Sequence, residues 1–173
     1  MLDNIMYVVC TGSSTIRLYS ADTCSPLDAV IDVEGMKYPC DIVVCRDDRQ
    51  LYFADVGYDG AHWSGIWRVS CNDHSYVKWL TGSTTDAFRA AALSLTSRRL
   101  LVTSYWSRRL RQYSTTDRQL LRVVELPQYV SHVLHGVETT RGTFVVGHEG
   151  TSQNRQLQPA VSELLSLGLR SGK

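Results

Sequence analysis

An all-β fold, made of repeated antiparallel sheets of four strands, is what the sequence predicts on three observations. The first is a recurring phrase, a β-rich run, a polar connection and a second β-rich run, clearest at 50–69 as QLYFADVGYDGAHWSGIWRV. The second is its spacing, because Tyr7, Tyr52, Leu101 and Phe144 occupy matching places at steps of 45, 49 and 43 residues. The third is that Gly, Ser, Asp, Asn or Pro residues separate the β-rich runs. A period in this range is typical of β-propeller blades.

Composition is that of an ordinary globular chain. The 173 residues are 43% hydrophobic and 20% charged, which disfavours disorder and fits one domain with a sizeable core. A net charge of +1 lowers the expectation of a general nucleic-acid binder. No run of about 18 apolar residues occurs, and the first residues lack a basic start and a long apolar centre. We therefore expect no membrane span and no signal peptide, and a cytoplasmic location.

The cysteines point the same way. There are five, an odd number, and none forms a C-x-x-C pair. This pattern disfavours both a disulfide framework and a zinc finger, and it predicts reduced thiols.

The first two repeats are expected at roughly 1–35 and 36–83. Their strands are short, β-branched or aromatic runs between turn residues. The predicted strands are 6–10, 15–20 and 29–33 in the first repeat, and 41–45, 51–54, 65–70 and 76–80 in the second. The second repeat is therefore a complete blade of four strands, whereas the first lacks an opening strand.

The other two repeats are expected at roughly 84–126 and 127–173. The predicted strands are 91–95, 100–103, 109–114 and 120–124 in the third repeat, and 133–138, 142–147 and 161–167 in the fourth. The last of these has an alternative, because Val161, Leu164, Leu165 and Leu169 fall at helical spacing. The repeat context favours a strand.

The second repeat resembles an NHL repeat. The resemblance rests on YPCDIVV at 38–44, QLYFAD at 50–55 and IWRV at 66–69, and in weaker form it covers roughly residues 5–150. The first and third repeats replace the Ala54-Asp55 pair with Cys10-Thr11 and Thr103-Ser104. The WD40 family is less similar, because no Trp-Asp dipeptide closes a strand.

The resemblance implies a propeller, commonly of six blades, whereas the predicted strands make only an incomplete, open one. An open array exposes apolar sheet faces at its two ends. Either the sequence is part of a longer propeller or a second copy completes it, and the incomplete terminal repeats favour the first. We expect the isolated chain to self-associate through its open blades.

Loops that join antiparallel strands alternate between the two ends of a sheet. The loop after the second strand therefore shares an end with the connection to the next blade. Aromatic and Arg side chains on loops of a rigid scaffold are typical of binding surfaces. The candidate partner-binding residues are Tyr58, His62, Trp63, Tyr105, Trp106, Arg108 and Arg109, joined by Tyr38, Phe88, Arg89 and Tyr129. The alternative is that Trp63 and Trp106 pack back onto the blades, since Trp is largely buried on average.

Positive charge is concentrated in the third repeat. Residues 84–126 carry eight bases and three acids, whereas residues 1–35 carry one base and five acids. All eight bases are Arg, which suits a bidentate grip on carboxylate or phosphate. They are Arg89, Arg98, Arg99, Arg108, Arg109, Arg111, Arg118 and Arg122. Strand alternation and turn positions should divide them between the two ends of the blade, so a solvated edge is the favoured interpretation.

Signals for catalysis are weak. His132 and His135 stand three positions apart, so in a strand they face opposite sides, and His148-Glu149 lacks further donors nearby in sequence. No G-x-S-x-G elbow or phosphate-binding glycine loop occurs. We predict a non-enzymatic scaffold that binds a protein or peptide partner, without cofactor or metal. The alternatives are binding of single-stranded RNA by the same loops, and a propeller enzyme with a central metal.

Overall fold

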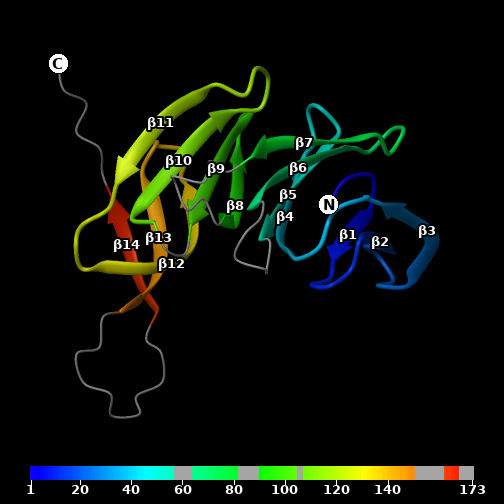
Figure 1. Ribbon diagram of the computed structural model, residues 1–173, viewed down its shortest axis with the longest axis horizontal. Coiled ribbons are helices and arrows are strands. Elements are labelled where there is room, and N and C mark those ends of the chain that lie inside the picture. The colour runs from blue at the N-terminus through cyan, green and yellow to red at the C-terminus, as the bar shows by residue number, and fades with distance from the viewer. Residues whose placement is uncertain (57–63, 82–89, 105–106, 151–161, 168–173) are drawn as a thin grey trace, which may run out of the picture. The chain divides into compact units, whose positions relative to one another are not determined.

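The fold is all-β, as predicted (Figure 1). The computed structural model describes residues 1–56, 64–81, 90–104, 107–150 and 162–167. Over these ranges fourteen strands form four antiparallel sheets, and no helix is present. The chain divides into two compact parts, the N-terminal half Met1–Ala90 and the C-terminal half Ala91–Lys173.

The N-terminal half contains the first two sheets. The first has the order β1-β2-β3, with β1 at Ile5–Val9, β2 at Thr15–Ser20 and β3 at Pro26–Asp32. The second has the order β4-β5-β6-β7, with β4 at Pro39–Cys45, β5 at Gln50–Val56, β6 at Ser64–Ser70 and β7 at Tyr76–Thr81. Strand β3 begins before the predicted Ala29, because its pairing with β2 continues past an irregularity to Tyr19 and Pro26.

The C-terminal half contains the other two sheets. The third has the order β11-β10-β9-β8, with β8 at Ala90–Thr96, β9 at Arg99–Ser104, β10 at Arg109–Ser114 and β11 at Leu120–Glu125. The fourth has the order β12-β13-β14, with β12 at Val130–Glu138, β13 at Phe144–Gly150 and β14 at Ser162–Leu167. The favoured strand at the last segment is thus confirmed over the helix.

Period-two alternation builds the core of the N-terminal half. Ile16 and Leu18 of β2 and Ile31 of β3 are buried, and they join one cluster with Leu51, Phe53, Trp67 and Val69 of the second sheet. The Phe53 and Trp67 rings stack with centroids 6.1 Å apart. The first two sheets therefore pack face to face, with aromatic side chains at the centre.

The third and fourth sheets pack in the same way. Leu101 and Leu110 are buried against Val133, Phe144 and Val146. Strand β12 also approaches β9 closely at Gly136, where a Cβ atom would lie 3.0 Å from Thr103 Cγ2. A larger residue at position 136 would therefore have to displace the Thr103 side chain by a few tenths of an ångström.

The turn before the last strand of the first three sheets is built in the same way each time. It spans 20–25, 70–75 and 114–119, and its fifth residue is left-handed, at φ 54° in Cys24, 60° in His74 and 64° in Arg118. The amide of that residue donates to the carbonyl of the first, for example His74 N to Ser70 O at 3.1 Å. Hydroxyl groups of Ser70 and Ser75 lower the pKa of Asp73 to about 2, and Ser114 lowers that of Asp117. Both carboxylates are therefore ionised acceptors that hold the turns.

Glycine at the left-handed position should stabilise the chain. The left-handed conformation destabilises a residue other than Gly by roughly 1–2 kcal/mol. Gly avoids this steric cost, but part of the gain is offset because Gly makes the unfolded chain more flexible. Arg118→Gly should therefore raise the free energy of unfolding by about 0.5–1 kcal/mol, as measured by urea denaturation. Thr116→Gly in the same turn is the control, since Thr116 does not have a positive φ. Thr116→Gly should lower the free energy of unfolding by about 0.5–1 kcal/mol, a change of opposite sign. A change of the same sign and size in both variants would contradict the backbone explanation.

Candidate functional site

The structure places two of the seven predicted partner-binding residues. Tyr58, His62, Trp63, Tyr105 and Trp106 lie outside the described residues, as do Phe88 and Arg89. Arg108 and Arg109 are described and exposed, and they stand where β10 begins. We call this end of the third and fourth sheets, with the connection 126–129, the loop end.

Arg108 and Tyr129 lie together at the loop end. The amide of Leu126 donates to the carbonyl of Arg108 at 2.8 Å, which ties the connection to the start of β10. The guanidinium Nη1 of Arg108 donates to the carbonyl of Gln128 at 3.5 Å. Tyr129 follows directly and is 55% exposed. The exposed Tyr129 thus follows a residue whose carbonyl accepts from Arg108, on a connection tied to the start of β10.

Arg109 is engaged within its own sheet. Its Nε lies 2.6 Å from Glu125 Oε1, across the β10–β11 pair in which these two residues are direct partners. Both side chains are largely exposed, 46% and 65%. The pair therefore reduces the local positive charge that a phosphate would meet at this position.

Tyr38, which was expected beside the loop residues, is held through Asp55. The Asp55 side chain is buried and accepts three hydrogen bonds, from Lys37 N at 3.2 Å, Tyr38 N at 2.7 Å and Trp67 Nε1 at 3.2 Å. The amide of Val56 also donates to the carbonyl of Tyr38 at 3.0 Å. The carboxylate thereby anchors the connection between the first two sheets, which explains the acidic residue that ends the β-rich run of the second repeat.

The arginines of the third repeat are divided between two ends of the sheet. Arg108 and Arg109 stand at the loop end, whereas Arg98, Arg99 and Arg118 stand in or beside the turns at the other end. The predicted division therefore holds for these five. The interpretation as a solvated edge is wrong for Arg111, which is buried within β10, and for Arg122 of β11, which contacts a buried carboxylate. The larger group lies away from the loops to which partner binding was assigned.

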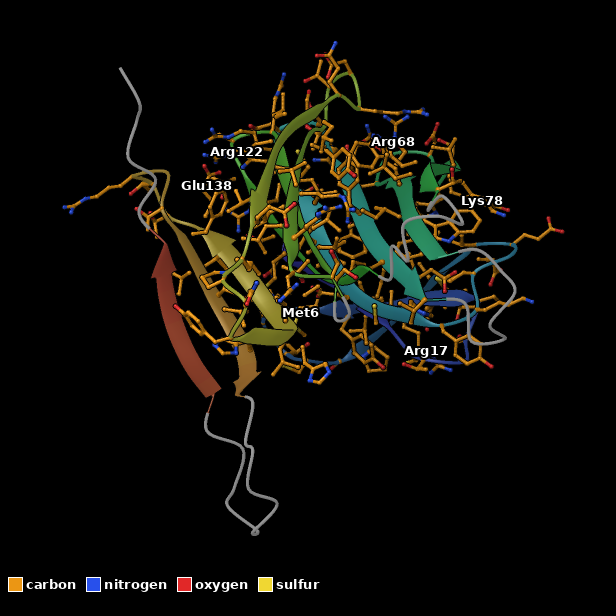
Figure 2. All side chains as sticks on the ribbon, turned by 60° about the vertical axis from the view of Figure 1, so that its left-hand side comes forward. Met6, Arg17, Arg68, Lys78, Arg122 and Glu138 are labelled. Atoms are coloured by element: carbon orange, nitrogen blue, oxygen red, sulfur yellow. The ribbon has the colours of Figure 1, made fainter. Side chains whose placement is uncertain are left out.

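A buried carboxylate organises that larger group. Glu138 of β12 has a side chain only 2% exposed, and its Oε2 accepts from Gln112 Nε2 at 2.7 Å. Its Oε1 lies 3.1 Å from Arg122 Nη2, and Oε2 lies 3.5 Å from Arg99 Nη2. Figure 2 shows Arg122 and Glu138 together, from β11 and β12. The guanidinium of Arg122 also lies over the Phe144 ring, 4.5 Å from its centroid. With Phe144 included, this network joins five strands of two sheets, β9 to β13.

The histidines do not assemble a metal site among the described residues. Two irregularities in the pairing of β12 with β13 bring His132 to a φ of 49°, and His135 is exposed while His148 is buried. In the ranges that the structure describes, no group of three His, Cys, Asp or Glu side chains is arranged to hold a metal ion. The five cysteines are free thiols. No helix in the described part of the chain is long and apolar enough to cross a membrane.

Sequence reasoning missed the Glu138 network. A glutamate at the end of a predicted strand normally points to solvent. The available signal was that Glu138 ends a β-rich run and that Gln112 stands among the polar residues of the strand 109–114 in the preceding repeat. That signal does not reveal which arginines reach the carboxylate.

Comparisons with known proteins identify the fold. No family model matches the sequence, and no curated protein matches it either. Solved structures do match. A chain of a nidogen–laminin complex is 13% identical with a TM-score of 0.67, over 84% of this chain and 51% of that one. Hydrazine synthase of Kuenenia stuttgartiensis is 15% identical with a TM-score of 0.65, over 87% and 42%. A hypothetical selenium-binding protein of Sulfolobus tokodaii is 13% identical with a TM-score of 0.66, over 84% and 39%.

These similarities are to β-propeller folds, at identities that inform on fold alone. The chain spans about half or less of the length of each matched structure. Together with the four antiparallel sheets and the turn that the first three of them share, they show that this chain is built of β-propeller blades.

Proposed function

We propose that this chain is a non-enzymatic, NHL-like β-propeller segment that binds a protein or peptide partner through its loop end. The observation that carries the proposal is that Arg108 contacts the carbonyl of Gln128, next in sequence to the 55% exposed Tyr129, on a connection that the Leu126 amide ties to β10. Arg and Tyr are enriched among the residues that dominate binding energy at protein interfaces. A fixed backbone limits the entropy lost on binding.

One matched structure adds support by analogy. It is a complex of nidogen with laminin, so one chain of similar fold occurs in a protein–protein assembly. The proposal that the blades are NHL-like is supported by Asp55. This residue ends the motif that resembles an NHL repeat, and its carboxylate holds the connection between the first two sheets.

Loss of loop-end side chains should remove the partner. We expect proteins that co-purify with the 173-residue chain from nuclease-treated extract to be lost with Arg108→Ala/Tyr129→Ala. Truncation of an interface anchor typically costs about 2 kcal/mol or more, roughly a thirtyfold weaker complex. Lys78→Ala, an exposed change in β7, is the control and should retain the partner.

RNA binding is separated from protein binding by fluorescence anisotropy with random single-stranded RNA at about 150 mM salt. The protein-binding proposal predicts no RNA binding at micromolar chain. RNA affinity in the micromolar range that disappears in Arg108→Ala/Arg109→Ala, and falls by about 1–3 kcal/mol in Trp106→Ala, would replace it with the RNA function.

A further inference from the structure

Three turns of the C-terminal half are held against one another at the end of the sheets opposite the loop end. They span 97–98, 115–119 and 139–143, and we call them the turn edge. Thr115 donates through its amide and its hydroxyl to the carbonyl of Arg98, at 2.9 and 3.1 Å. The hydroxyl of Thr96 donates to the carbonyl of Glu138 at 3.4 Å. The turn edge is therefore a defined surface.

The turn edge is basic. Its exposed charged residues are three arginines and one aspartate, Arg98, Arg118, Arg141 and Asp117. The corresponding turns of the N-terminal half, at 3–4, 21–25, 46–49 and 71–75, carry two arginines and five aspartates. Because the same kind of turn is acidic in one half and basic in the other, turn geometry alone does not explain the positive charge.

Two further arginines beside these turns already show a geometry that binds carboxylate. Arg99 and Arg122 both contact the carboxylate of Glu138, yet their side chains remain 41% and 31% exposed. Contact with the Phe144 ring further restricts the guanidinium of Arg122. A guanidinium fixed by one carboxylate and partly open to solvent is preorganised to donate to a second one.

Apolar surface adjoins the charge. Leu120 and Leu121 begin β11 immediately after the turn at 115–119, and they are 51% and 49% exposed. Strand β11 is the outer strand of the third sheet, so its far side has no strand partner in the described ranges. An exposed strand edge is where an extended peptide can add by backbone pairing.

We propose that the turn edge and the start of β11 bind an extended protein segment rich in Asp and Glu, with apolar residues between them. Its carboxylates pair with the turn arginines and with the exposed sides of Arg99 and Arg122, and its apolar side chains cover Leu120 and Leu121. Single-stranded nucleic acid fits less well, because no aromatic residue is among the exposed large hydrophobic residues of these turns and strand ends, as far as the structure describes them. This second surface is separate from the loop end.

The test is fluorescence anisotropy of the complete chain with a labelled peptide rich in Glu and containing Leu at every fourth position. Arg98→Asp/Arg118→Asp should weaken binding about tenfold or more, because two attractive contacts become repulsive. Aspartate tolerates the positive φ that both positions have. Arg108→Asp/Arg109→Asp makes the same change in charge at the loop end and should alter binding by less than about twofold.

Further variants and probes keep the outcome decisive. If the turn variant lowers the unfolding midpoint, Arg141→Gln takes its place, since Arg141 has no positive φ.

Leu120→Ser should weaken peptide binding by about threefold or more. A peptide with Gln in place of every Glu should bind at least about tenfold more weakly. The proposal is overturned if the peptide does not bind, if both double variants weaken it equally, or if an oligothymidylate of equal charge binds more tightly. Retained peptide binding in a loop-end variant that has lost its co-purifying protein would show that the two surfaces act independently.

Discussion

Asp55→Ala should destabilise the chain by about 3 kcal/mol, because three donors, one of them fully buried, lose their common acceptor. The Asp55 side chain is the acceptor for Lys37 N, Tyr38 N and Trp67 Nε1. Removing it leaves two part-buried amides and one buried indole N–H without that partner, and a buried unsatisfied group costs about 1–3 kcal/mol. Urea denaturation followed by tryptophan fluorescence measures the effect, since Trp67 itself is one of the donors.

Two further substitutions test the cause. Asp32→Ala removes an exposed carboxylate in β3 and should change stability by less than about 0.5 kcal/mol. Asp55→Asn keeps one acceptor oxygen but brings an amide N–H₂ toward other donors, so an intermediate loss is expected. Equal effects of Asp55→Ala and Asp32→Ala would show that the hydrogen-bonded anchor contributes nothing specific.

Glu138→Ala should cost about 3 kcal/mol, toward the lower end of the range for breaking a buried ion pair. The lower end applies because Arg99 and Arg122 are 41% and 31% exposed and regain some hydration. The buried amide of Gln112 also loses its acceptor, and the removed side chain leaves a void next to Phe144. The free energy of unfolding in urea is the measurement.

Glu125→Ala is the matched control for Glu138→Ala. The Arg109–Glu125 pair is shorter, at 2.6 Å, than either contact of Glu138 with arginine. It is nevertheless largely exposed, and exposed pairs contribute about 0–1 kcal/mol. If the shorter, exposed pair proved to be the more stabilising one, burial would not be the determining factor in this network.

The strands were predictable because each is a short β-branched, aromatic or apolar run bounded by polar or turn residues. In β5 and β9, for example, a continuous apolar run follows a polar first residue and ends before Asp55 or Thr103. Two strands, β3 and β12, begin three residues before their predicted starts, and β12 begins at Val130 rather than the predicted Val133. Its two pairing irregularities interrupt the alternation that strand prediction depends on, so residues 130–132 do not carry a period-two signal.

The candidate site was predictable only in part. The sequence indicated that arginines would divide between the two ends of the third sheet, because strand polarity and turn positions decide this locally. The contact of Arg122 with Glu138 joins residues sixteen apart in sequence through two different sheets. Such contacts depend on how blades pack, and no local pattern encodes them.

Two arginines of the turn edge lie in left-handed turns, where their side chains lower the stability of the fold. Arg98 and Arg118 both have a positive φ, 61° and 64°, a conformation that glycine adopts without steric strain. A protein needs only enough stability to stay above its functional threshold. At these two sites the arginine side chain exposes a guanidinium, and the left-handed backbone makes the chain less stable than glycine would. A stability–affinity trade-off is expected at such positions: replacing either arginine by glycine should raise the free energy of unfolding and weaken binding at the turn edge.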